Sequence, residues 1–268
     1  NSLVGTTASD AVGSAGITAL TNGNYVVNSY YWNNGALAEA GAVTWGNGLT
    51  GTVGNVSALN SLVSTYQQSQ TGKNGVVDLN NGNYVVVSPF YTIQRPFGGY
   101  RVGAVTWVDG SGPIIGQVSS ANSLVGDNGY DYVGSGGVTA LTNGNYVVLS
   151  PDWRNGSVTK AGAVTWGDGS IAGPRLTGQV TNLNSLVGSA VDDKVGLDGV
   201  TQLANGNYVV VSSEWGGSLG SKLGAVTWGS GTGAITGTVS ASNSLVGNVS
   251  DDRVGRDGIQ VVGSNNYL

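Results

Sequence analysis

One pattern of apolar and polar positions recurs along the chain with a period of 59 to 62 residues. Each period contains four short apolar or β-branched runs bounded by Gly, Asn or Pro, as expected of β-strands joined by turns. In the third period these runs are 137–141, 146–150, 161–166 and a segment from Gly178 to Val187. No apolar stripe with the 3.6-residue spacing of a helix accompanies them. The periodicity indicates a repeat protein built from copies of one small β-unit.

Two local signals define the unit. An Asn-Gly pair separates the first two runs, which predicts a hairpin with a type I′ turn; the pairs are Asn22-Gly23, Asn81-Gly82, Asn143-Gly144 and Asn205-Gly206, and Ser264-Asn265 takes this place in the last period. The second run is apolar at successive positions, as in Val85 to Val87, whereas a sheet with one wet face would alternate. The sheets are therefore expected to be covered on both faces.

Four-stranded antiparallel sheets stacked face to face, with about 60 residues each, predict a β-propeller. We expect one propeller domain over 1–268, with repeats 1–59, 60–121, 122–183 and 184–242 and a partial repeat 243–268. Five blades are expected, the last completed by the N-terminal strand at 1–4. The alternative is part of a larger ring or array. Because the chain lacks Met and breaks off within a repeat, it is also expected to be a fragment of a longer chain.

Composition narrows the possible partners and cofactors. Charged residues are 9% of the chain and the net charge is −5, so no basic stripe is available to neutralise nucleic-acid phosphates or anionic lipids. No apolar run approaches the roughly 18 residues of a membrane helix, so membrane insertion is not expected. With no His and no Cys, disulfides and the usual zinc ligands are excluded, and no cofactor is expected.

The motifs Asp-x-Val-Gly, Tyr-Val-Val-x-Ser-Pro at 146–151 and Ala-Gly-Ala-Val at 161–164 resemble the FG-GAP repeat. This resemblance implies the propeller fold of integrin α-subunit heads and of large bacterial surface proteins, and a binding role. Many FG-GAP repeats carry an Asp-rich calcium loop in the first hairpin. This chain has Asn-Gly-Asn there, so no metal ligands are transferred.

Candidate ligand-binding residues include an aromatic ring three positions after the last Ser of the second run in each repeat: Trp32, Tyr91, Trp153 and Trp215. At a strand end beside a variable loop, such a ring could stack on a sugar or peptide, and Asp152 and Glu214 lie next to two of them. The alternative is that the rings fill the space between blades. A second Trp closes the third run and is expected to pack between blades; these are Trp45, Trp107, Trp166 and Trp228.

The Asp and Glu residues of the chain are expected to stabilise turns rather than to act in catalysis or metal binding. The Asp of Asp-x-Val-Gly is expected to accept backbone N–H bonds in a turn, although neighbouring acids leave a calcium site as the alternative. The motif Asp occurs at Asp10, Asp131, Asp193 and Asp252, and Ser69 replaces it in the second repeat. Without His, and without carboxylates in unlike environments, general acid-base catalysis is not expected. The chain is predicted not to be an enzyme.

The loop after the second run is most unusual in the second repeat, where 90–101 concentrates aromatic residues with Arg95, Tyr100 and Arg101. Variable loops on a rigid scaffold commonly bind ligands, so this loop is a candidate binding site. The alternative is a loop whose sequence has diverged and that packs on itself. Two functions follow. The first is an extracellular or cell-surface adhesion module that binds a protein ligand, and the second is a lectin with one aromatic-lined sugar site per blade.

Overall fold

The computed structural model describes residues 2–217, 222–263 and 266–267, which form β-strands, turns and loops with no α-helix. The chain divides into two compact units: Asn1–Gly134 with Gly169–Gln179, and Ser135–Asp168 with Val180–Leu268. None of the described elements is a helix with the length and apolar character needed to cross a membrane. The prediction of an all-β repeat protein is confirmed.

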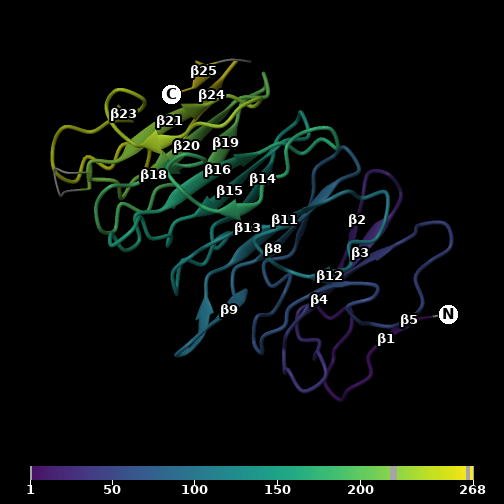
Figure 1. Ribbon diagram of the computed structural model, residues 1–268. Helices are drawn as coiled ribbons and strands as arrows, with labels where there is room; N and C mark the ends of the chain where they lie inside the picture. The colour runs from purple at the N-terminus through teal and green to yellow at the C-terminus, as the bar shows by residue number, and fades with distance from the viewer. Residues whose placement is uncertain (1, 218–221, 264–265, 268) are drawn as a thin grey trace. The chain divides into compact units, whose positions relative to one another are not determined.

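The strands are short, and most belong to sheets of four or five (Figure 1). The first unit contains β1 (Leu3–Val4), β2 (Ile17–Ala19), β3 (Tyr25–Ser29), β4 (Ala42–Gly46), β5 (Gly54–Asn55), β6 (Leu62–Val63), β7 (Val76–Asp78), β8 (Tyr84–Ser88), β9 (Thr92–Arg95), β10 (Gly98–Arg101), β11 (Ala104–Val108), β12 (Gly116–Gln117), β13 (Leu124–Val125) and β17 (Gly178–Gln179). The second contains β14 (Gly137–Ala140), β15 (Tyr146–Ser150), β16 (Ala163–Gly167), β18 (Leu186–Val187), β19 (Val200–Gln202), β20 (Tyr208–Ser212), β21 (Ala225–Gly229), β22 (Gly237–Thr238), β23 (Leu245–Val246), β24 (Val261–Val262) and β25 (Asn266–Tyr267).

Each larger sheet begins with the four antiparallel strands expected from the sequence, for example β2-β3-β4-β6. Three of the sheets then gain a fifth strand, which is parallel to its neighbour and comes from the following repeat: β12 beside β6, β17 beside β13, and β22 beside β18. We call β5, β12, β17 and β22 the exchange strands. The prediction of four-stranded antiparallel blades is corrected here, because the segment from Gly178 to Val187, expected as one strand, contains two short strands that pair with different neighbours.

The second strand of each sheet is buried along its length, as its unbroken apolar run predicts; β8, β15 and β20 have no exposed residue. The predicted hairpin before it is present, but its turn is not type I′. Gly23 has positive φ whereas Asn22 does not, Gly23 N donates to Leu20 O, and Leu20 N donates to Asn24 O. This is a three-residue loop closed by a left-handed glycine, so only one of its central residues needs positive φ.

Neighbouring repeats are joined by three side-chain donors that converge on one carbonyl oxygen. Asn22 Nδ2, Asn24 Nδ2 and Trp45 Nε1 lie 2.9, 3.0 and 2.9 Å from Gly110 O. The same contacts join Asn81, Asn83 and Trp107 to Gly169 O, and Asn143, Asn145 and Trp166 to Gly231 O. The expectation that the third-strand Trp packs between repeats is confirmed at these three positions.

The predicted completion of the last blade by the N-terminal strand is not confirmed, since the pairing of β1 lies within the first unit. β1 pairs with the exchange strand β5 in parallel, with Leu3 opposite Gly54, and the two form a sheet of their own. At the other end of the sequence, β24 pairs only with β25 among the described residues. The predicted Ser264-Asn265 turn lies outside the described residues.

Candidate functional site

The four periodic rings predicted to stack on a ligand are buried. Trp32, Tyr91, Trp153 and Trp215 expose between 3% and 9% of their surface. A tight turn causes this in each repeat, because the amide of the ring residue donates to the carbonyl of the Ser three positions earlier, as Trp32 N does to Ser29 O at 2.9 Å. The Tyr91 hydroxyl also donates to Val118 O at 3.0 Å, and burial raises its pKa. These rings offer no open face, and the structure assigns them to packing.

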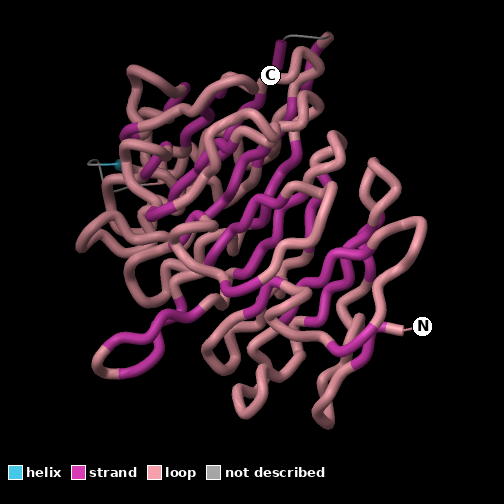
Figure 2. Tube along the Cα trace, turned by 45° about the vertical axis from the view of Figure 1, so that its right-hand side comes forward, coloured by secondary structure: helices cyan, strands magenta, loops and turns pink. Residues whose placement is uncertain are grey.

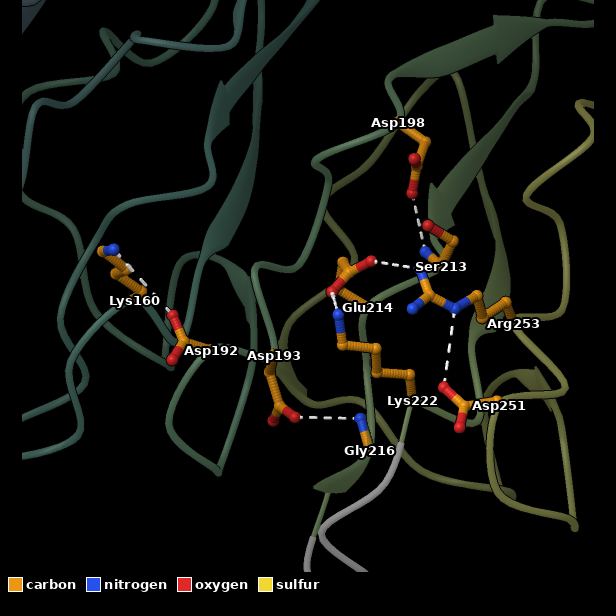
Figure 3. Close-up of polar contacts among 10 residues, drawn as sticks. All are labelled: Lys160, Asp192, Asp193, Asp198, Ser213, Glu214, Gly216, Lys222, Asp251 and Arg253. Atoms are coloured by element: carbon orange, nitrogen blue, oxygen red, sulfur yellow. Dashed lines mark hydrogen bonds and ion pairs between the residues drawn. The ribbon is translucent and has the colours of Figure 1, made fainter.

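The Asp of each Asp-x-Val-Gly motif holds a turn, as expected. Asp193 is 2% exposed, and its Oδ2 accepts the amides of Ser189 and Ala190 while its Oδ1 accepts those of Gly216 and Gly217, at 2.8 to 3.0 Å. Figure 3 shows the bond from Gly216. The oxygens that calcium would need are thus already used by amides. In addition, no group of three or more possible acidic metal ligands occurs among the residues described.

Glu214, a predicted ligand contact, instead joins two repeats. Its carboxylate lies 2.6 Å from Lys222 Nζ and 2.8 Å from Arg253 Nη1, and Arg253 also reaches Asp251 at 3.6 Å (Figure 3). The hydrogen bond from Lys222 lowers the pKa of Glu214 below its usual 4.5. The attraction of both cations acts in the same direction, and burial of the carboxylate opposes it. These charges neutralise one another, so Glu214 is unsuited to recognise an incoming ligand.

The positions equivalent to Glu214, Lys222 and Arg253 carry other compatible groups at other repeat junctions. In the first, Gln70 Nε2 donates to Glu39 at 2.6 Å. In the second, the Arg101 guanidinium lies 4.9 Å from the Phe90 ring centroid, and Phe90 meets Tyr132 edge to face at 5.9 Å. Arg101 is therefore also partly engaged in a junction. Asp152 is half-buried and makes no hydrogen bond or ion pair among the described residues.

The loop predicted as the odd one, in the second repeat, forms the hairpin β9-β10. Its strands leave the sheet between β8 and β11 (Figure 1), and Figure 2 shows both strands joined by a short loop. The equivalent segments of the first and third repeats contain single bridges, Asn34 to Leu37 and Asn155 to Val158. In the fourth repeat, residues 218–221 of this segment lie outside the described residues. Phe97 at the hairpin tip is 95% exposed.

The hairpin is held near its tip by packing and charge. Arg95 Nη2 lies 2.8 Å from Asp127 Oδ1, which also accepts a hydrogen bond from Gln179 Nε2 at 2.9 Å. The Tyr66 ring packs so closely over Gly99 that a side chain there would overlap it. Arg95 is thus a support for the hairpin, and Tyr100, at 37% exposure, remains available.

A cavity of about 480 Å³ lies beside the hairpin, lined by Phe97, Gly99, Tyr100, Arg101, Gly129 and Tyr130. Tyr130 is 69% exposed and lies 5.9 Å from Tyr132 in an edge-to-face contact. We call Phe97, Tyr100 and Tyr130 the aromatic patch. Of the predicted residues, the structure brings Tyr100 and Arg101 to this place and leaves Trp32, Trp153, Trp215, Asp152 and Glu214 away from its lining.

Tyr130 was missed at the sequence level because it belongs to the third repeat. A signal was present, since the Asp of the motif, Asp131, is flanked by Tyr130 and Tyr132, where the fourth repeat has Asp192 and Lys194 beside Asp193. A second hollow, of about 390 Å³, adjoins Trp107, but the Arg175 guanidinium covers that ring at 3.4 Å and is held by Ser170 O and Ile171 O. Its aromatic face is therefore already occupied.

Comparison with known proteins places the repeat in a family. The description of that family, a repeat of unknown function (DUF5650), fits residues 1–14, 19–73, 78–135, 140–197 and 202–256. The full-length matches run from the first hairpin of one sheet to the Asp-x-Val-Gly turn of the next, for example Ala19 to Lys73. A comparison with curated proteins found no match. Because the five matched segments run through most of the chain, it belongs to the family described as a repeat of unknown function (DUF5650).

Proposed function

We propose that the protein is a non-enzymatic binding module that engages a protein ligand through the aromatic patch. The observation that carries this proposal is the exposure of Phe97, Tyr100 and Tyr130 around one cavity on a hairpin that is held near its tip by the ion pair of Arg95 with Asp127. Exposed aromatic side chains gathered at one place are typical of interaction surfaces, and aromatic residues commonly dominate their binding energy.

The distribution of aromatic groups favours one site over many. A lectin with one sugar site per repeat would use the periodic rings, which are buried. The aromatic patch belongs to the second repeat and its junction with the third, so an asymmetric protein contact fits it better. A single sugar site is the second candidate, because the cavity volume of about 480 Å³ lies within the range of small-ligand sites and its walls are aromatic.

Two broader features belong to the same proposal. We propose that the sheets are blades of a propeller of FG-GAP type, supported by the period near 60 residues and the apolar second strands. We also propose an extracellular or cell-surface location, which suits an adhesion module with low charge and no Cys. Small-angle scattering of the purified chain tests the first, since a closed ring and an extended array of the same mass differ in radius of gyration. Immunolabelling of intact cells tests the second.

The binding proposal is tested with intact cells and three versions of the chain. The double substitution Phe97→Ala with Tyr130→Ala is expected to lower the affinity by about a hundredfold or more, because hot-spot aromatic residues contribute about 2 kcal/mol or more each. Leu49→Ala is the matched control, since Leu49 is also an exposed apolar residue, at 97%. Unchanged binding of the double variant would refute the role of the aromatic patch.

Treatment of the cells separates the two ligand classes. Loss of binding after mild protease digestion supports a protein ligand. Inhibition by free sugars would refute a protein ligand and support a carbohydrate ligand. Binding to a glycan array that Phe97→Ala abolishes would do the same.

A further inference from the structure

A charged side chain lies at one fixed position of each repeat, two residues before the Gly of Gly-Ala-Val-Thr-Trp. The residues at this position are Glu39, Arg101, Lys160 and Lys222. The two lysines form ion pairs, Lys160 with Asp192 at 4.0 Å and Lys222 with Glu214 at 2.6 Å (Figure 3). Glu39 instead accepts a hydrogen bond from an amide side chain of the next repeat. The charge therefore has a polar or oppositely charged partner in three of the four repeats.

The junction of Arg101 differs, because it has no acidic side chain at the equivalent positions. Phe90 stands at the position of Glu214, and the place of Asp192 is taken by Tyr130. Among the described residues, the Arg101 guanidinium makes no hydrogen bond or ion pair. It lies over the Phe90 ring, 4.9 Å from the centroid. The positive charge of this junction thus has no carboxylate partner in the part of the chain that the structure describes.

Arg101 lines the cavity beside the hairpin and is the one charged residue among the described residues of that lining. Asp127, which lies near the same hairpin, is already bound by Arg95 at 2.8 Å and by Gln179 at 2.9 Å. The net charge of the chain is −5, so the molecule as a whole does not attract an acidic ligand. Any attraction of such a ligand to this cavity has to come from Arg101.

The way in which Arg101 is held suits a carboxylate. A guanidinium that lies over an aromatic ring contacts the ring through its flat face. Its N–H groups lie in the plane of the group, where they match the two oxygens of a carboxylate. The neighbouring ring is also fixed, since the Tyr100 ring packs so closely on Gly129 that an added Cβ there would overlap it. Groups that are positioned before a ligand arrives lose less entropy on binding.

We propose that Arg101 and the aromatic patch bind a segment of the protein ligand in which an Asp or Glu side chain is flanked by apolar residues. This inference rests on the proposed function and names the chemistry of its partner. Arg101 binds the carboxylate through two N–H groups, and the rings of the aromatic patch cover the apolar neighbours. A phosphate group fits less well, because its charge of about −2 is usually met by a cluster of Arg residues, and this cavity has one.

Selection of random peptides displayed on phage, with the whole chain as the target, tests the proposal. The recovered peptides are expected to carry Asp or Glu beside aromatic or aliphatic residues, because both parts of the site then contribute. The peptide recovered most often is synthesised, and its affinity for the protein is measured by calorimetry. A selection that recovers no peptide, or that enriches no acidic residue, overturns the proposal.

Arg101→Gln is expected to lower the affinity for that peptide about tenfold or more, because a hydrogen-bonded charge pair is lost. Replacing the acidic residue of the peptide with its amide should have the same effect on the unchanged protein. The two changes together should cost little more than either alone, since they remove one interaction. Lys160→Gln is the matched control, because it removes a cation at the same position of a repeat where Asp192 is its partner, and it should leave the affinity unchanged.

The outcomes separate this inference from the proposed function. If Phe97→Ala with Tyr130→Ala abolishes binding to cells and peptide while Arg101→Gln changes neither, the aromatic patch remains a binding site and the role of Arg101 is refuted. If none of these substitutions changes binding, both proposals fail. Arg101-dependent binding of acidic glycans on an array would refute a peptide ligand. The amide version of the peptide requires no change in the protein, so the test does not depend on the folding of Arg101→Gln.

Discussion

Removing the Asp193 carboxylate is expected to be far more damaging than removing the same group from Asp252. Asp193 accepts four amides, of which those of Gly216 and Gly217 are buried and those of Ser189 and Ala190 are partly buried. In Asp193→Ala each buried amide loses a charged acceptor, at about 2 kcal/mol, while each partly buried amide is rehydrated and loses about 0.5 kcal/mol. The expected loss in the free energy of unfolding is about 5 kcal/mol.

Asp252→Ala is the matched control. Among the residues that the structure describes, Asp252 accepts the amides of Asn248 and Val249, both at 2.9 Å and exposed, so its loss should cost about 1 kcal/mol. Urea titration followed by fluorescence measures both, and the transition of the second unit is the one expected to move. Hydrogen exchange adds a local readout, because the Gly216 and Gly217 amides should exchange faster in Asp193→Ala. Equal losses for the two variants would refute the assignment of these turns to amide binding.

Three further outcomes are expected. Gly162→Ala should lower the free energy of unfolding by about 3 kcal/mol or more, because Gly162 has a φ of 78° and an added Cβ would overlap the Val195 nitrogen. Gly156→Ala is the control, since Gly156 has a φ of 60° and open space around it, and it should cost about 1 kcal/mol in the same melting assay. Glu214→Gln should destabilise by about 1 kcal/mol at pH 7. Because the pKa of Glu214 is lowered on folding, this difference in melting temperature should persist above pH 4.5 and vanish as the pH falls through the folded-state value. Calcium or a chelator should leave the melting temperature unchanged, and a calcium-dependent rise would contradict the turn role of the motif acids.

The sequence was most informative where one residue type has one physical use in every copy. The buried second strands, such as Tyr84–Ser88, follow from unbroken apolar runs, and the turn role of Asp193 follows from a short carboxylate before glycine. The turn at Asn22-Gly23 was predicted correctly as a hairpin and wrongly in type, because Asn-Gly also suits a three-residue loop in which only the glycine has positive φ.

Other features depend on contacts between distant segments. The exchange strand Gly116–Gln117 recurs as Gly-x-Val, but the sequence does not show that it pairs with Leu62–Val63 at the other end of the same period. Periodicity revealed that Trp32 recurs but could not show whether its ring points inward, since that depends on the turn at Ser29. The aromatic patch was only half visible, because Tyr130 approaches Tyr100 through the junction of two repeats.

The exchange strands also bear on how such a chain can change its length. Each of the three five-stranded sheets ends with a strand of the following period; the sheet begun at Ile17, for example, ends with Gln117. All four exchange segments read Gly-x-Val, and all meet the same Asn-Ser-Leu-Val run. A gene that gains or loses one whole period therefore recreates an identical joint, whereas loss of part of a period leaves two sheets incomplete. Duplication and deletion in whole periods are thus the changes that this architecture tolerates without any compensating substitution.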